Sequence, residues 1–159
     1  MESKYSLKKR KSYISCMQEG SGSTVTRHLP LKVTEKSLEQ LFSSIDDYLG
    51  TNYRPGGASS HGFDCSGFVF YIYKQNFRML LPRTSGELAL LGSMVPKKQL
   101  RPGDLVFFSS NGSRIDHVGI FIGENRFAHA ATGGIMINQL QERYYNFHYA
   151  CAARLITTE

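Results

Sequence analysis

The stretch GFDCSGFVFYIY, residues 62–73, places a cysteine directly before a strongly apolar run. The apolar side chains after the cysteine recur at the spacing of one helix face and are Phe68, Val69, Ile72, Tyr73 and Phe77. We therefore expect a helix that begins at Cys65. At such a position the free backbone N–H groups and the positive end of the helix dipole favour the thiolate and can hold an oxyanion. A buried structural cysteine is the competing interpretation, because cysteine is also a common core residue.

Two more helices are predicted on either side of this stretch. The first begins near Ser37, which forms a capping box with Gln40. Its apolar stripe consists of Leu38, Leu41, Phe42, Ile45, Tyr48 and Leu49. The second is short, at about residues 85–91, where Thr84 and Glu87 form another capping box.

After Pro102 the sequence becomes rich in residues that favour strands. The predicted strands are 104–108, 118–122, 127–131, 135–137 and 149–156. A run of helices followed by a run of strands is typical of an α+β fold and not of an alternating α/β fold. The length of 159 residues suits one such domain, which can bury a core without disulfides or metals.

The first 33 residues differ from the rest of the chain. They show no sustained apolar period, and residues 18–23 (QEGSGS) are typical of a flexible linker. Basic residues crowd their start: Lys4, Lys8, Lys9, Arg10 and Lys11. We therefore divide the chain into a flexible basic segment, residues 1–33, and one domain, residues 34–159. The segment is either a solvated tail or a weak attractant for a polyanion, and no Lys/Arg repeat with stacking aromatics indicates a nucleic-acid module.

The cysteines constrain the compartment only weakly. Cys16, Cys65 and Cys151 are an odd number without a C-x-x-C pair, which argues against a disulfide framework and a four-cysteine zinc site. Residues 13–16 (YISC) loosely resemble the box before a lipidated cysteine. The apolar segment of a signal peptide is missing, however, because Lys11 lies five residues before Cys16. No apolar run approaches the roughly 18 residues of a membrane span.

A nucleophilic cysteine needs a base, which is usually histidine, and the base needs an orienting partner. The histidines in loop-like sequence are expected on the surface and are His28, His61 and His148. His117 and His129 differ, because both fall in the predicted strand pair.

The register of that strand pair can be predicted. A three-residue loop 123–125 with Asn125 in the left-handed conformation pairs positions whose numbers sum to 248. His117 then faces Ala131 and His129 faces Gly119, so the histidines are diagonal neighbours on one face, roughly 7–8 Å apart at the backbone. A two-residue turn would place them on opposite faces. We expect this face to lie over the helix of Cys65.

The same three side chains suggest an alternative. Cys65, His117 and His129 could bind zinc with an open fourth position, although the only nearby carboxylates for a supporting shell are Asp64 and Asp116.

Several stretches together resemble the NlpC-type cysteine peptidases of bacterial cell walls, which are papain-like. The matching stretches are YRPGG (53–57), DCSGF (64–68), LPRTS (81–85), LRPGDLVFF (100–108), HVGIFIG (117–123) and FAHA (127–130). Their order and spacing match across about residues 36–156, and the N-terminal 33 residues fall outside the match. The resemblance implies N-terminal helices packed on a mainly antiparallel sheet of five or six strands.

The resemblance also implies roles for single residues. Cys65 is the nucleophile, His117 the base and His129 the residue that orients the base. Tyr53 aligns with a tyrosine thought to stabilise the oxyanion. The positions that can contact the amino end of the stem peptide are Asp64 and Ser66. The sequence departs from the family pattern at Gly86 and in the short loop 109–115. We expect these departures to alter the groove that decides substrate choice.

The implied activity is hydrolysis of peptidoglycan stem peptides, at either the γ-D-glutamyl–diaminopimelate bond or the D-alanyl–diaminopimelate cross-link. The pattern is most similar to short, single-domain lipoprotein members, some of which cut cross-links. The resemblance implies no cofactor or metal, a location in the cell envelope and, if Cys16 is lipidated, membrane attachment; we also expect a monomer. Two alternatives stay open: a catalytically silent wall-binding module, and an intracellular thiol enzyme such as a deamidase or acyltransferase.

Overall fold

The computed structural model describes residues 9–158. Lys4 and Lys8 of the basic segment therefore lie outside the described residues. The helices are α1 (Glu35–Tyr48), α2 (Cys65–Phe77), α3 (Ser85–Leu88), α4 (Arg143–His148) and a 3-10 helix, η2 (Lys97–Gln99). The three predicted helices are confirmed; α4 and η2 carry no periodic apolar signal and were not expected.

The N-cap of α1 is not the residue that was predicted. Thr34, and not Ser37, is the N-cap, because its side chain accepts a hydrogen bond from the Ser37 backbone N–H. Leu41 and Ile45 of the predicted stripe are buried. The start of α3 agrees with the prediction, since Thr84 accepts from the Glu87 N–H and its hydroxyl donates to the Glu87 carboxylate.

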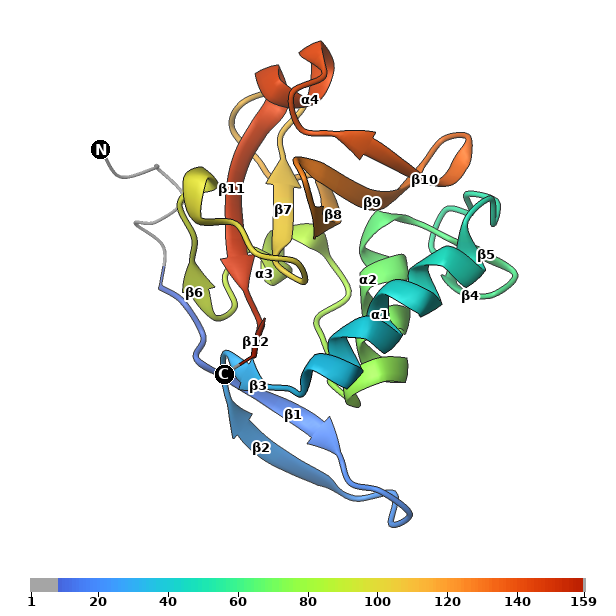
Figure 1. Cartoon of the computed structure of the whole chain (residues 1–159), viewed down its shortest axis with the longest axis vertical. Helices are drawn as coiled ribbons and strands as arrows, with labels where there is room; N and C mark the ends of the chain where they lie inside the picture. The colour runs from blue at the N-terminus through green and yellow to red at the C-terminus, as the bar shows by residue number, and fades with distance from the viewer. Residues whose placement is uncertain (1–8, 159) are drawn as a thin grey trace.

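The centre of the fold is a six-stranded sheet in the order β10-β9-β8-β7-β11-β6, antiparallel throughout (Figure 1). Its strands are β6 (Ser93–Met94), β7 (Leu105–Phe108), β8 (His117–Gly123), β9 (Arg126–Ala131), β10 (Gly134–Gln139) and β11 (Tyr149–Arg154). The predicted α+β class with a mainly antiparallel sheet of five or six strands is confirmed.

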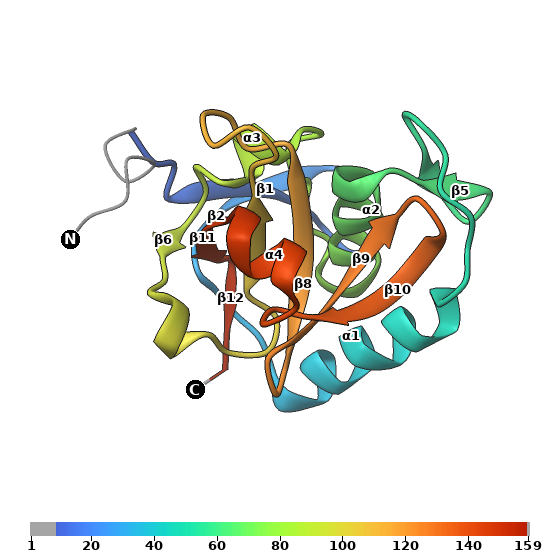
Figure 2. The same ribbon diagram turned by 90° about the horizontal axis from the view of Figure 1, so that it is seen from above.

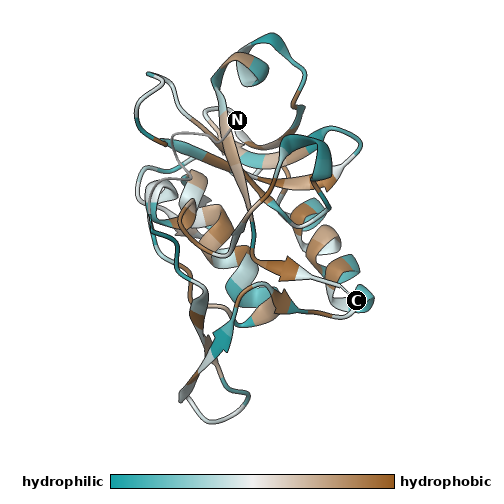
Figure 3. Ribbon diagram, turned by 90° about the vertical axis from the view of Figure 1, so that its left-hand side faces the viewer, coloured by the Kyte–Doolittle hydropathy of each residue, from teal (hydrophilic) through white to brown (hydrophobic). Residues whose placement is uncertain are grey.

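The two faces of this sheet bury different clusters. On β7 the alternating residues Leu105 and Phe107 belong to the main core with α2, whereas Val106 and Phe108 belong to a second cluster on the other face. Tyr145 of α4 packs against that second cluster. Figure 2 shows α4, β8 and α2 from above, and Figure 3 shows hydrophobic and hydrophilic residues alternating along the helices and strands.

The segment expected to be a flexible linker forms regular structure where it is described. β1 (Tyr13–Met17) and β2 (Thr24–His28) make an antiparallel hairpin, and residues 18–23 are its turn region. Ile14 and Cys16 are 8% and 3% exposed in the main core. The physical reason is the period of two in β1, which points these two side chains inward. The division at residue 33 itself stays a prediction.

Backbone contacts join this hairpin to the rest of the fold. β1 exchanges hydrogen bonds with the segment after α2, from Met17 N to Arg78 O and from Leu80 N to Ser15 O. β3 (Leu31–Lys32) pairs in parallel with β12 (Ile156–Thr157) near the C-terminus.

β4 (Ala58–Ser59) and β5 (Gly62–Phe63) form a short hairpin directly before α2. Within residues 9–158 no helix is long and apolar enough to span a bilayer.

Candidate active site

Cys65 is the first residue of α2, as predicted. The N-cap is Asp64, whose Oδ1 accepts a hydrogen bond of 2.7 Å from the Gly67 backbone N–H. A capped helix start fixes the orientation of the free N–H groups around the thiol.

Arg83, which lies two residues before α3, binds the carboxylate of Asp64. Its guanidinium contacts both oxygens of Asp64, at 2.9 and 3.0 Å, and also donates to Ser66 Oγ and to the Gly57 carbonyl. Ser66 Oγ in turn donates to the Arg83 carbonyl at 2.6 Å. Arg83 lies in the LPRTS stretch and had no predicted role, because its place beside an acidic N-cap depends on a contact with a residue 19 positions away.

Asp64 and Ser66 border the hollow that contains Cys65. Their oxygens are already bound by Arg83 and the helix, and Ser66 is only 6% exposed. The structure therefore gives both residues a part in holding the start of α2, and their contact with a substrate stays a prediction.

The thiol of Cys65 points at the start of β8. Its Sγ lies 3.8 Å from the carbonyl oxygen of Asp116, the residue before His117. Burial, with a smaller contribution from Asp64, raises the pKa of the Cys65 thiol above its usual value, although backbone N–H groups act in the opposite direction. The expected thiolate at the helix N-terminus is thus not favoured in the resting site, because burial outweighs the helix.

His117 and His129 form a pair, as the register predicted. His117 Nε2 and His129 Nδ1 are 2.7 Å apart, and the pairings of Ile120 with Ala128 and of Phe121 with Phe127 both sum to 248. The histidines lie on the same face as Phe108 and Phe127. This is the face opposite α2, and not the α2 face that was expected, because Val118 and Ala128 take the inward positions.

Cys65 and His117 therefore approach each other around the end of β8. Among the described residues, no hydrogen bond joins the Cys65 sulfur to His117, and the sulfur contacts the neighbouring carbonyl instead. Burial and the nearby His129 lower the pKa of His117 to about 4, so this imidazole is neutral at pH 7 and able to accept a proton.

Two residues that were not predicted extend the pair. His129, which is 1% exposed, contacts Asn138 Oδ1 through Nε2 at 2.7 Å. Asn138 Nδ2 donates to both oxygens of Glu142 at 3.2 Å. Their place follows from the register of β10, which pairs Met136 with His129 and so makes Asn138 the diagonal neighbour on the same face.

Two hollows border the site. One, of about 480 Å³, contains Cys65, Asp64 and Arg83. The other, of about 700 Å³, contains both histidines together with Tyr144, Tyr145 and His148. Tyr53, which is 38% exposed, and Asp116 border both hollows. The site is therefore open on both sides of the thiol and histidine pair.

The other histidines lie as expected in two cases. His28 and His61 are exposed, and the ring of His28 packs on Tyr13 at 4.2 Å. His148, expected on the surface, is half-buried at the end of α4 and borders the larger hollow, because its Nδ1 contacts the Ser109 carbonyl at 3.0 Å.

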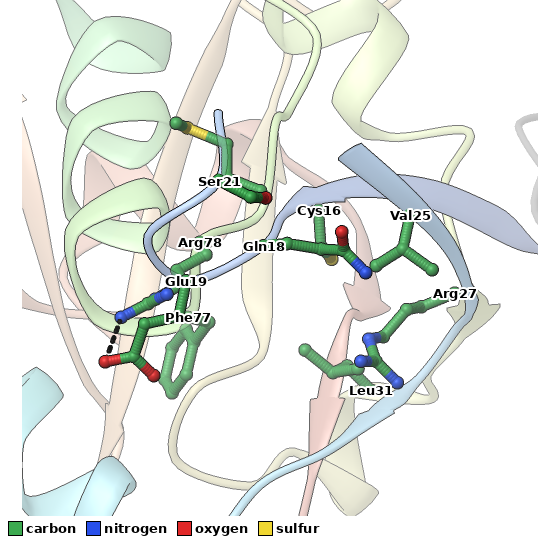
Figure 4. Close-up of a pocket in the computed structure, with 10 residues that line it drawn as sticks. Cys16, Gln18, Glu19, Ser21, Val25, Arg27, Leu31, Phe77 and Arg78 are labelled. Carbon is green, nitrogen blue, oxygen red and sulfur yellow. Dashed lines mark ion pairs between the residues drawn. The ribbon is translucent and has the colours of Figure 1, made fainter. Parts of the chain in front are cut away.

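A separate hollow of about 660 Å³ lies between the β1–β2 hairpin and the end of α2 (Figure 4). Arg78 and Glu19 form an ion pair of 3.3 Å at its edge. No histidine lines it, and burial raises the pKa of its one cysteine, Cys16. This hollow lacks the groups that a thiol-dependent reaction needs.

The zinc alternative finds no support in the geometry. Within residues 9–158 no three His, Cys, Asp or Glu side chains are arranged to hold a metal ion. Both ring nitrogens of His129 are already engaged, by His117 and Asn138.

Comparison with known proteins gives a consistent result. Residues 50–154 match the NlpC/P60 family. The chain is 40% identical over 117 residues to a probable endopeptidase NlpC homolog of Haemophilus influenzae, covering 73% of this chain and 62% of that protein. It is 37% identical over 138 residues to the Escherichia coli murein DD-endopeptidase MepS/murein LD-carboxypeptidase, covering 80% of this chain and 73% of that protein.

Solved structures agree with these sequence matches. An NlpC/P60 family protein from Bacillus cereus superimposes with a TM-score of 0.72 at 30% identity, over 89% of this chain and 47% of that one. The NlpC/p60 domain of the peptidoglycan hydrolase SagA superimposes with a TM-score of 0.64 at 28% identity, over 73% of this chain and 97% of that domain.

Proposed function

The chain belongs to the NlpC/P60 family, and on that premise we propose that it is a cysteine peptidase that hydrolyses amide bonds in peptidoglycan. The chain spans 62% of the length of the Haemophilus relative. The substrate class is supported by the relatives, among them proteins named as murein and peptidoglycan endopeptidases.

One observation carries the proposal. The capped N-terminus of α2 places the Cys65 sulfur against the backbone of Asp116, so the next residue, His117, is the histidine adjacent to the thiol. His117 is in turn hydrogen-bonded to a buried second histidine. A nucleophile, a base and an orienting group are the three parts of a thiol peptidase site.

The reaction follows from these positions. The thiol turns from the Asp116 carbonyl toward His117 Nδ1, which takes its proton as the sulfur attacks the scissile carbonyl carbon. The carbonyl electrons move to oxygen, and the N–H groups at the start of α2 stabilise the oxyanion. His117 then gives its proton to the leaving amine, and a water molecule, deprotonated by the same histidine, releases the acyl group.

Because the resting pKa values favour a neutral thiol and a neutral imidazole, the proton passes to His117 only as the sulfur attacks the scissile carbonyl carbon. Burial raises the pKa of the Tyr53 hydroxyl, so Tyr53 stays a proton donor at neutral pH and is proposed as a further oxyanion donor. Tyr53→Phe should lower kcat by about 100-fold with little change in KM; an unchanged kcat would remove Tyr53 from the mechanism.

The cross-link is the favoured bond. Two E. coli relatives carry the name murein DD-endopeptidase. The proposed substrate is accordingly the D-alanyl–diaminopimelate cross-link, and the γ-D-glutamyl–diaminopimelate bond is the second candidate.

Digestion of purified muropeptides, followed by mass spectrometry, tests the proposal. The wild-type protein should convert cross-linked dimers to monomers, whereas Cys65→Ala should convert none while unfolding at the same temperature. Equal product from both proteins would sink the assignment of the nucleophile. No product from either would favour the alternatives, a silent wall-binding module or an intracellular thiol enzyme, and rapid labelling of Cys65 by iodoacetamide would then select the latter.

The proposed location is the cell envelope, where this substrate lies. The burial of Cys16 argues against attachment through a lipid on this residue. Cys16 lies within β1 and is 3% exposed in the main core, so a lipid there would have to displace packed side chains.

A further inference from the structure

A line of hydrogen bonds runs from the proposed base to the surface. It begins at His117 on β8, passes through His129 on β9 and Asn138 on β10, and ends at Glu142, the residue before α4. Its two histidine contacts are both 2.7 Å, and His129 is almost completely buried.

The carboxylate of Glu142, at one end of this line, determines which atom donates and which accepts in each of its hydrogen bonds. The carboxylate of Glu142 can only accept, so it requires the NH₂ group of Asn138 and turns the amide oxygen toward His129. That oxygen can only accept, so His129 carries its proton on Nε2. The neutral His129 ring then offers Nδ1 as an acceptor to the Nε2–H of His117. His117 is left with an unprotonated Nδ1, which is the form that can take a proton from the thiol.

We propose that Asn138 and Glu142 are positioning residues that select the base-competent tautomer of His117 through His129. The inference rests on the proposed function in treating His117 as the base. Within residues 9–158, no hydrogen bond joins either residue to the thiol.

A structural role is the competing explanation, because Glu142 also accepts from the Gln139 backbone N–H at 2.6 Å and so braces the turn before α4. The two roles predict different results. Bracing the turn requires only an acceptor at position 142, whereas selecting the tautomer requires a defined sequence of donors and acceptors. Substitutions that exchange donors for acceptors therefore separate them.

Nitrogen-15 NMR of the imidazole rings tests the tautomers without any turnover. In a Cys65→Ala background, His117 and His129 should each be protonated on Nε2 and unprotonated on Nδ1 at pH 7. Adding Asn138→Leu removes the acceptor for the buried His129 Nε2–H, and we expect the other tautomer to predominate in both rings. Unchanged ring nitrogens in the Asn138→Leu variant would overturn the inference.

Kinetics on muropeptides provide the second readout. Asn138→Leu should lower kcat about tenfold with KM unchanged, because the wrong tautomer of a buried group is then favoured by about that ratio. The double variant Asn138→Asp with Glu142→Gln reverses the donor and acceptor between the two positions but still presents an acceptor to His129. It should recover kcat to within about threefold of wild type, whereas a kcat as low as that of Asn138→Leu would contradict the proposal.

Glu39→Gln is the matched control, since Glu39 is an exposed residue of α1, remote in sequence from the site. It should leave kcat and both tautomers unchanged. If wild-type protein cuts no muropeptide but shows the expected tautomers, the proposed function fails and the positioning role stands. If wild-type protein is active and the tautomers are insensitive to Asn138, only the positioning role fails.

Discussion

The carboxylate of Asp64 joins the start of α2, where Cys65 lies, to Arg83. Asp64 caps α2 through the Gly67 N–H and at the same time binds both terminal nitrogens of Arg83. The guanidinium also reaches the Gly57 carbonyl, so the loop before β4 is joined to the helix start. The position of the Cys65 thiol therefore depends on contacts that Cys65 itself does not make.

Gly67 is the residue whose substitution should disturb this arrangement most directly. A Cβ at position 67 would overlap the Gly57 carbonyl oxygen and lie 2.8 Å from Asp64 Oδ1 and 2.9 Å from Arg83 Nη2. We expect Gly67→Ala to cost about 1–3 kcal/mol of unfolding free energy and to lower kcat, because Cys65 lies in the same helical turn. Urea unfolding and muropeptide digestion measure the two effects.

Gly86→Ala is the control for this prediction. A Cβ at position 86 meets nothing within 4 Å, and alanine is favoured over glycine in a helix by about 0.5–1 kcal/mol. The variant should therefore be as stable as wild type or slightly more so, with unchanged kcat. A Gly67→Ala protein that behaves like Gly86→Ala would show that the contacts around Arg83 do not position the nucleophile.

At this scale the sequence could identify residues whose neighbours are near in the chain or fixed by strand pairing. Cys65 and the histidines were predicted in this way, as was their order. The charge state of the thiol was not, because the burial that raises the pKa of Cys65 comes from packing. Arg83 and Glu142 were missed for a related reason, since arginine and glutamate on the surface are ordinary until a fold brings them to a partner.

At the scale of elements, strand register decides whether the histidine pair exists. The turn after β8 has two residues in the left-handed conformation, Glu124 and Asn125, and not the three-residue loop that was predicted. A bulge between Phe121 and Gly123 adds the missing residue and restores the predicted register. The predicted loop length was wrong, whereas the left-handed Asn125 and the pairing were right, because a bulge and a longer loop shift the register equally.

The β1–β2 hairpin shows where local patterns carry too little information. Only Ile14 and Cys16 point inward from β1, and the hairpin is held by contacts with residues 78–80, far along the chain. Helix α4 is similar, because none of its residues is fully buried. By contrast α2 has seven buried residues, from Ser66 to Phe77, in 13 positions, so its period was visible in the sequence.

Docking of the hairpin can be measured. Ile14→Ala should lower the free energy of unfolding by about 3 kcal/mol, because it removes a buried aliphatic side chain from the main core. Ser15→Ala, on the exposed face of the same strand, should change it by less than about 0.5 kcal/mol. Equal stability of Ile14→Ala and wild type in urea unfolding would mean that the hairpin does not pack on the domain in solution.

At the scale of the whole molecule, the sheet separates two chemical tasks. One face packs on α2 and forms the main core, and the other carries the histidine pair beneath α4. The thiol and the base meet around the end of β8, between two hollows that share Tyr53 and Asp116. Placing a half-buried and a buried histidine, both neutral at pH 7, on a folded sheet has a consequence for stability in acid.

Stability should fall as the pH is lowered from about 6.5 toward 4. Burial lowers the pKa of His117 to about 4, against about 6.5 when unfolded, and it also lowers the pKa of His129. Between these values the unfolded chain binds protons that the folded chain does not, so the free energy of unfolding decreases with decreasing pH. The His117 contribution between pH 7 and pH 5 is about 2 kcal/mol.

Urea unfolding at pH 7 and pH 5 measures this loss, and substitution isolates the His117 part from that of other titrating groups. His117→Gln should lose about 2 kcal/mol less than wild type over this interval, whereas His61→Gln, at an exposed position, should lose as much as wild type. If His117→Gln and wild type lose the same stability, His117 is protonated in the folded protein at pH 5. In that case the imidazole could not serve as a neutral base in mild acid, and activity should disappear over the same pH interval.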